Sequence, residues 1–90
     1  MPVTEEAGDK ESRVVQASSH IGSQITYLRT LAIRAIEDWR KSAVSDRWRV
    51  VMRIRTTQDQ ITRLKHRHPA IANQPSPLAW ADTWDPRRET

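Results

Sequence analysis

The chain has 90 residues, a net charge of +4 and no cysteine. These features limit it to one small domain and exclude disulfide frameworks, thiolate catalysis and cysteine-based zinc sites. Hydrophobic residues make up 37% of the chain and charged residues 29%, with two glycines and no phenylalanine, which favours an all-α fold over a turn-rich β protein.

Residues 1–11 are acidic and polar, with Gly8 among them, and we expect a flexible N-terminus there. Residues 12–41 follow as the first predicted helix. Its seam residues recur at alternating intervals of four and three, the spacing of a heptad repeat. The seam consists of Val14, Ser18, Ile21, Ile25, Leu28, Ala32, Ala35 and Trp39. Those expected in core or dimer contacts are Ile21, Ile25, Leu28 and Trp39.

Residues 45–68 contain seven of the fifteen Lys and Arg residues. Between Trp48 and Arg55, apolar residues alternate with arginines, a period that also fits a β-strand. Two stripes with helical spacing run further, and they favour a helix over the whole stretch. The basic stripe consists of Arg49, Arg53, Thr56, Gln60, Arg63 and Arg67. The apolar stripe consists of Val50, Ile54, Thr57, Ile61, Leu64 and His68.

We expect Ser45 to be the N-cap of this second helix. Pro69 should end it, because the residue before a proline is pushed out of the helical region. Only residues 41–46 connect the two helices, and so short a connection joins antiparallel neighbours. Residues 12–68 are therefore predicted to form an antiparallel helical hairpin.

One hairpin cannot cover both of its apolar faces. A two-fold dimer that forms a four-helix bundle is the simplest way to bury them. We expect Trp39 and Trp48 to lie in the core at the end of this bundle. The residues of the second helix expected in core or dimer contacts are Val50, Ile54, Ile61 and Leu64.

Residues 69–90 hold four of the five prolines and two of the four tryptophans. Ser76 and Pro77 match the start of one short helix, and Pro86 would end it. This segment either caps the end of the bundle or presents its tryptophans to another protein, since tryptophan is a favoured anchor at interfaces.

The basic stripe is the feature that indicates a function. It spans about 27 Å at 1.5 Å per residue, which approaches one turn of a duplex, about 34 Å in B-form DNA. The arginine fork suits phosphate, and Thr and Gln can bond sugar hydroxyls. Without aromatic residues the stripe lacks stacking platforms for single strands, so backbone readout of double-stranded RNA fits best. Arg34 and Lys41 of the first helix would extend this surface.

Other chemistry is not indicated. The sequence contains no catalytic triad, phosphate-binding loop or metal-ligand spacing, so we expect no enzyme activity, no cofactor and no metal. No run reaches the roughly 18 apolar residues of a membrane span, and the start is not a signal peptide. We therefore expect no membrane partner and a cytoplasmic location. The basic stripe alternatively serves as a solvated face or pairs with acids of a partner.

The order of elements over residues 12–72 resembles that of the nodavirus RNA-silencing suppressors. The similar local patterns are residues 55–61, RTTQDQI, and residues 68–72, HPAIA. The resemblance implies a homodimeric four-helix bundle that lies along double-stranded RNA without sequence preference. It also implies a viral protein in the host cytoplasm that hides RNA from Dicer, a possible protein partner, and blocks loading of small interfering RNA.

Two other functions stay open at this point. The seam and the C-terminal tryptophans would also suit a helical interaction or assembly protein that does not bind nucleic acid. A small DNA-binding regulator would share the basic helix.

Overall fold

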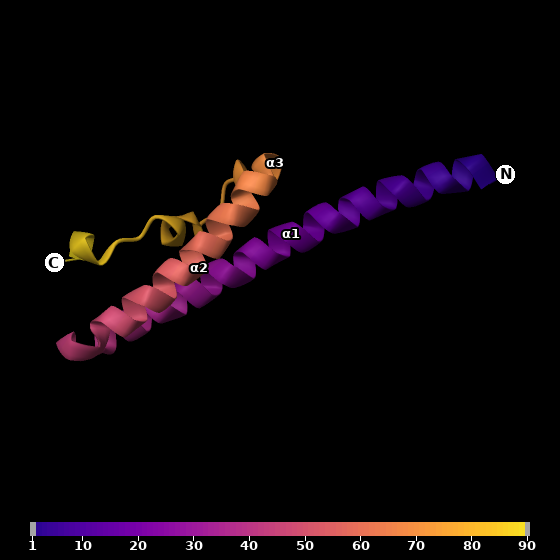
Figure 1. Cartoon of the computed structure of the whole chain (residues 1–90). Coiled ribbons are helices and arrows are strands. Elements are labelled where there is room, and N and C mark those ends of the chain that lie inside the picture. The colour runs from indigo at the N-terminus through magenta and orange to yellow at the C-terminus, as the bar shows by residue number, and fades with distance from the viewer. Residues whose placement is uncertain (1, 90) are drawn as a thin grey trace.

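The computed structural model describes the backbone of residues 2–89 and the side chains of residues 20–89. It contains α1 (Pro2–Lys41), η1 (Val44–Asp46), α2 (Arg47–Arg67), α3 (Pro69–Ala72), η2 (Ala79–Asp82) and η3 (Pro86–Glu89), as Figure 1 shows. No strand occurs over this range, so the all-α prediction is confirmed. The strand alternative for residues 48–55 is excluded, because they lie in α2.

The start of α1 differs from the expectation. The helix begins at Pro2 rather than Ser12, so the segment expected to be flexible is helical from Pro2 onward. Proline suits the first helical position, where its missing N–H has no partner to lose. Acidic residues near a helix N-terminus complement the dipole, and a single Gly8 costs only about 1 kcal/mol. The side chains of Val14 and Ser18 lie outside the described residues.

The turn between α1 and α2 corrects one prediction. Ser45 lies within the short helix η1 and does not cap α2, and Asp46, which precedes α2, makes no side-chain cap hydrogen bond. The end of α2 is as predicted, since His68 leaves the helical region with φ −132° and ψ 67°. Pro69 then begins α3, because proline is well tolerated at a first helical position.

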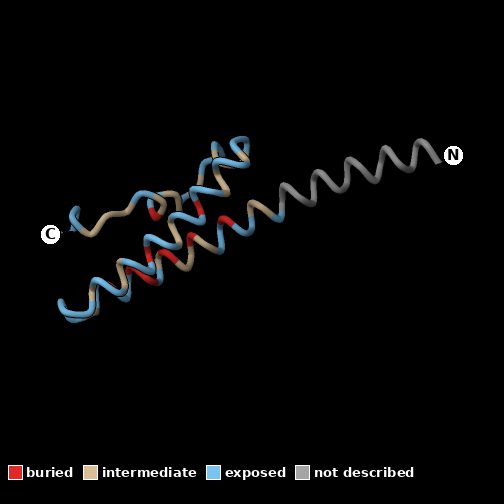
Figure 2. Tube along the Cα trace, viewed as in Figure 1, coloured by how far each residue is buried: buried red, intermediate tan, exposed pale blue. Residues whose placement is uncertain are grey.

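The core lies between α1 and α2, which pack side by side (Figure 2). The buried apolar residues of the two helices are Ile25, Ala32, Ala35, Ile36 and Trp39 of α1, and Ile54 and Ile61 of α2. The other expected core or dimer residues, Ile21, Leu28, Val50 and Leu64, are half-buried. The expectation for Trp48 is wrong, because its side chain is 62% exposed.

The C-terminal segment, residues 73–89, turns back and runs along α1 and α2 (Figure 1). It contains two short 3-10 helices rather than the one expected helix, and Pro86 begins the second instead of ending the first. Trp84 packs edge-on against Trp39, with ring centroids 5.3 Å apart. The segment therefore covers a face of the hairpin and does not cap its end.

Candidate nucleic-acid interface

All six members of the basic stripe are exposed on α2. Their spacing of three and four residues places them on one side of the helix, away from buried Ile54 and Ile61. On α1, Arg34 and Lys41 are also exposed. The side chains expected to contact RNA are thus all accessible to solvent.

Two arginines of the stripe pair with carboxylates. The Arg53 guanidinium lies 2.7 Å from Asp38, and that of Arg63 lies 3.7 Å from Asp59. In both pairs the side chains are more than half exposed, and such surface pairs contribute about 0–1 kcal/mol. A phosphate can therefore replace either carboxylate at small cost.

The remaining members of the stripe differ in their surroundings. The Arg49 guanidinium lies over the Trp48 ring, 5.4 Å from its centroid. The Thr56 hydroxyl donates a hydrogen bond to the Met52 carbonyl at 2.9 Å, so it can only accept from a ligand. Arg67 has no carboxylate partner among the described side chains.

A shallow groove between α1 and α2 gathers part of this surface. Two hollows form it, and only residues of these helices line them. From α1 these are Gln24, Leu28, Leu31, Arg34, Ala35 and Asp38, and from α2 Arg53, Thr57, Gln60, Arg63, Leu64 and Arg67. The groove thus joins Arg34 to four members of the stripe around apolar side chains. Arg49, Thr56 and Lys41 lie outside it.

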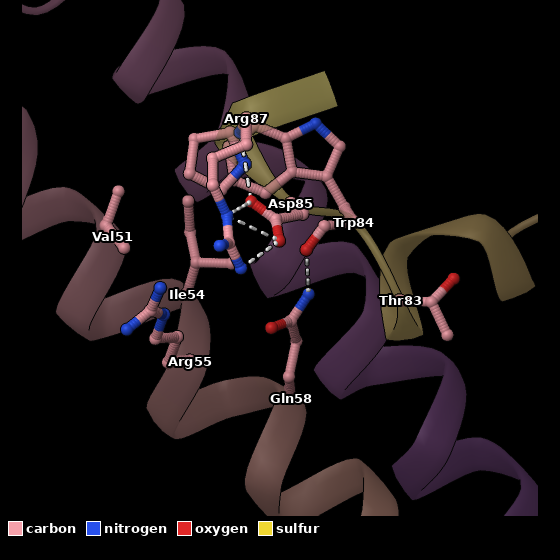
Figure 3. Close-up of a pocket in the computed structure, with 9 residues that line it drawn as sticks. Val51, Ile54, Arg55, Gln58, Thr83, Trp84, Asp85 and Arg87 are labelled. Carbon is pink, nitrogen blue, oxygen red and sulfur yellow. Dashed lines mark hydrogen bonds and ion pairs between the residues drawn. The ribbon is translucent and has the colours of Figure 1, made fainter. Parts of the chain in front are cut away.

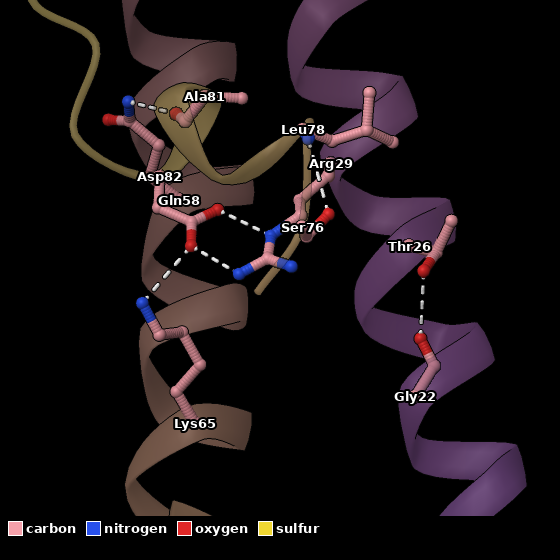
Figure 4. Close-up of polar contacts among 9 residues, drawn as sticks. All are labelled: Gly22, Thr26, Arg29, Gln58, Lys65, Ser76, Leu78, Ala81 and Asp82. Atoms are coloured by element: carbon pink, nitrogen blue, oxygen red, sulfur yellow. Dashed lines mark hydrogen bonds and ion pairs between the residues drawn. The ribbon is translucent and has the colours of Figure 1, made fainter. Parts of the chain in front are cut away.

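A second polar cluster holds the C-terminal segment against both helices (Figure 4). Arg29 of α1 donates two hydrogen bonds to Asp82, at 2.9 and 2.7 Å, and Lys65 of α2 donates a third at 3.1 Å. The Arg29 and Asp82 side chains are only 8% and 5% exposed. We call these three residues the Asp82 clamp.

The charges of the Asp82 clamp depend on one another. Burial alone would raise the pKa of Asp82, but the hydrogen bonds from Arg29 and Lys65 outweigh it and lower that pKa below its ordinary value. The bond to Asp82 in turn raises the pKa of Arg29. Both shifts favour the charged forms of Asp82 and Arg29, which fits a buried ion pair that holds the C-terminal segment in place.

Gln58 of α2 also holds the C-terminal segment in place. Its amide donates to the carbonyls of Ala81 and Trp84, both at 2.9 Å. A hollow of about 290 Å³ lies beside this contact (Figure 3). The Asp85 and Arg87 side chains at its edge pair with each other at 3.0 Å. The hollow therefore lies beside a part of the C-terminal segment that Gln58 holds in place.

The sequence reasoning missed the Asp82 clamp. One signal was present, since Arg29 stands between Ile25 and Ala32 on the apolar side of α1. An arginine in that position needs a buried partner, because an unpaired buried charge is costly. The partner itself is 53 residues away in sequence, and no local pattern points to it.

Comparisons with known proteins give no relative. No family model matches the chain, and neither the curated proteins nor the solved structures contain a significant match. No described helix is long and apolar enough to cross a membrane. Within residues 20–89, no group of three or more His, Cys, Asp or Glu side chains is placed to hold a metal ion.

Proposed function

We propose that this protein binds double-stranded RNA through the basic stripe, without sequence preference. The observation that carries the proposal is the exposure of all six stripe residues on one side of α2, over about 27 Å. Arg34 of α1 lines the groove between α1 and α2 together with Arg53. Lys41 adds a positive charge near the connection between the two helices. Guanidinium groups along a straight ridge match the regular phosphates of a duplex backbone.

The active form in this proposal is a homodimer. The half-buried side chains of Ile21, Leu28 and Leu31 on α1 would be covered by α1 of a second copy, and the exposed arginines on the α2 side of the groove would remain open to the duplex. The stripes on the two α2 helices would then contact successive stretches of one duplex. Such a dimer acts by occlusion, and it would hide RNA from Dicer and other host silencing proteins in the cytoplasm, as the resemblance to nodavirus suppressors implies.

A gel-shift panel of duplex RNA, duplex DNA and single-stranded RNA tests the proposal. We expect duplex RNA to bind most tightly, with an affinity that falls about 10³–10⁵-fold between 50 and 200 mM salt if a dimer contacts roughly six to ten phosphates. Arg63→Ala and Arg67→Ala should each weaken binding about fivefold or more, equally for all sequences.

Arg88→Ala is the matched control, because Arg88 is exposed in η3 and outside the stripe. It should bind RNA like the wild type. Equal binding by the Arg67→Ala and wild-type proteins would remove the stripe from the mechanism.

The apolar side chains in the groove favour a second candidate, a helical interaction protein without nucleic-acid binding. Leu28, Leu31 and Leu64 line the groove half-buried and would suit an amphipathic helix of a partner. No shift with any nucleic acid at low salt would favour this candidate. Preference for duplex DNA in the same panel would indicate a DNA-binding regulator.

A further inference from the structure

We propose that the tip of the hairpin is a docking surface for an anionic lipid bilayer. This tip comprises the connection after α1 and the first two turns of α2. The proposal centres on apolar side chains that lie outside the basic stripe, although Lys41, Arg49 and Arg53 border both surfaces. It does not depend on RNA binding. It goes beyond the finding that no described helix could span a membrane, since contact with a bilayer surface needs no spanning helix.

Three large apolar side chains line up at this tip. Val44, Trp48 and Met52 are 81%, 62% and 57% exposed. Trp48 and Met52 are four residues apart and adjacent on α2, about 6 Å along its axis, and Val44 precedes them in η1. They are three of the five exposed large hydrophobic side chains among the described residues. The folded chain leaves these three side chains more than half exposed, with the Arg49 guanidinium lying over the Trp48 ring.

Basic side chains surround the apolar line. Residues 40–55 contain six Lys or Arg residues and one acid, Asp46. Two of the six pair with carboxylates from elsewhere, Arg40 with Glu89 and Arg53 with Asp38. Lys41, Arg49 and Arg55 are exposed beside the tip, and no ion pair of theirs occurs among the described residues. The tip therefore combines exposed apolar groups with a net positive rim.

This combination favours a bilayer over the other occupants. A second copy would bring two positive rims together, which opposes tip-to-tip pairing. A nucleic acid would satisfy the arginines but would leave the aliphatic Val44 and the thioether of Met52 without a partner. Tryptophan suits the boundary between headgroups and acyl chains, and arginine and lysine reach anionic headgroups from there.

Vesicle co-sedimentation of the full chain tests the proposal. One vesicle preparation is phosphatidylcholine alone, and the other contains roughly one-third phosphatidylserine. We expect binding to the anionic vesicles, little binding to the neutral ones, and weakening by salt. Trp48→Ser and Val44→Ser should each reduce the affinity about tenfold, because each removes an inserted apolar group.

Trp80→Ser is the matched control, since Trp80 is 44% exposed but lies in η2, outside the tip. It should bind vesicles like the wild type, as should Arg67→Ala at the other end of α2. Helix content by circular dichroism checks that each variant is folded. Absence of binding to anionic vesicles would overturn the proposal, as would equal binding by folded Trp48→Ser, which would indicate charge attraction without insertion.

The same variants separate this proposal from RNA binding. Trp48→Ser should keep its affinity for duplex RNA, whereas Arg67→Ala should lose RNA affinity and keep vesicle binding. Loss of both activities in Arg67→Ala, which lies at the far end of α2, would contradict a separate role for the tip. If neither the wild type nor any variant binds RNA, the proposed RNA binding is wrong. The vesicle measurements would still decide whether the tip binds anionic bilayers.

Discussion

At the scale of single residues, charge is used in two different ways. Arg53 and Arg63 make exposed ion pairs that water screens, so they stay available to a ligand. The ion pair of Arg29 with Asp82 is almost completely buried, so Arg29 is not available to a ligand. Burial accounts for this difference, because losing the partner costs more free energy for a charge removed from water than for an exposed charge.

Replacing Asp82 tests the clamp. Asp82→Asn should lower the free energy of unfolding by about 3 kcal/mol at neutral pH, because it leaves the Arg29 charge buried with a weaker partner. Asp59→Asn, which removes an exposed pair within α2, is the control and should cost about 0.5 kcal/mol or less. Urea unfolding followed by tryptophan fluorescence measures both. Equal stability of the two variants would show that the clamp is not ionised or not closed in solution.

The clamp also predicts a dependence on pH. Because the folded protein lowers the pKa of Asp82, its contribution is complete above the unfolded value, about 3.9. It is lost as the pH falls from there through the lower folded pKa. The stability difference between wild type and Asp82→Asn should therefore be constant at neutral pH and shrink below about pH 4. A difference that grows on acidification would contradict this assignment.

At the scale of elements, different sides of α2 make different contacts. Ile54 and Ile61 face α1, the basic stripe faces solvent, and Gln58 and Lys65 hold the C-terminal segment. A helix can present these different sides because successive residues rotate by about 100°. A strand would offer two faces only and could not divide the same residues in this way.

This division gives a direct test of the helix. In a strand, Met52 and Ile54 would share one face, whereas in α2 Ile54 is 1% exposed and Met52 is 57% exposed. Ile54→Ala should therefore lower the free energy of unfolding by about 3 kcal/mol through a cavity. Met52→Ala, as the control, should change it by about 0.5 kcal/mol or less. Similar losses in chemical denaturation would support the alternating pattern instead.

At the scale of the whole molecule, the protein is a rod of 66 × 19 × 18 Å. The C-terminal segment covers one part of the hairpin surface, and the groove and the tip leave half-buried and exposed apolar groups on other parts. A small core of this kind gains stability from any partner that covers more of it. This is the physical basis of the proposed dimer.

Light scattering coupled to size-exclusion chromatography tests that dimer. The wild type should have about twice the chain mass of 10.4 kDa. Leu31→Asp places a charge among half-buried groove residues and should shift the protein to monomer, weakening association at least about tenfold. Val44→Asp at the exposed tip is the control and should stay dimeric. A wild type that is monomeric at high concentration would refute the dimer directly.

Much of the helical architecture could be predicted from sequence. The spacing of Ile54 and Ile61 relative to Arg49 and Arg53 is enough to place the two pairs on different sides of α2. Predictions at helix boundaries were less accurate, as Ser45 shows, because several local interactions of similar energy compete there. The exposure of Trp48 was missed, since a large aromatic residue in an apolar alternation gives no sign that its neighbours will leave it uncovered.

The sequence by itself determined that the chain is helical, where α2 ends and which of its residues share a side, because periodicity and proline act over a few neighbouring residues. Only the tertiary structure decided where the C-terminal segment lies, which charges become buried and which apolar side chains stay exposed. Arg29, Lys65 and Asp82 meet because three distant parts of the chain pack together. Contacts of this kind depend on the packing of whole elements, which local spacing does not encode.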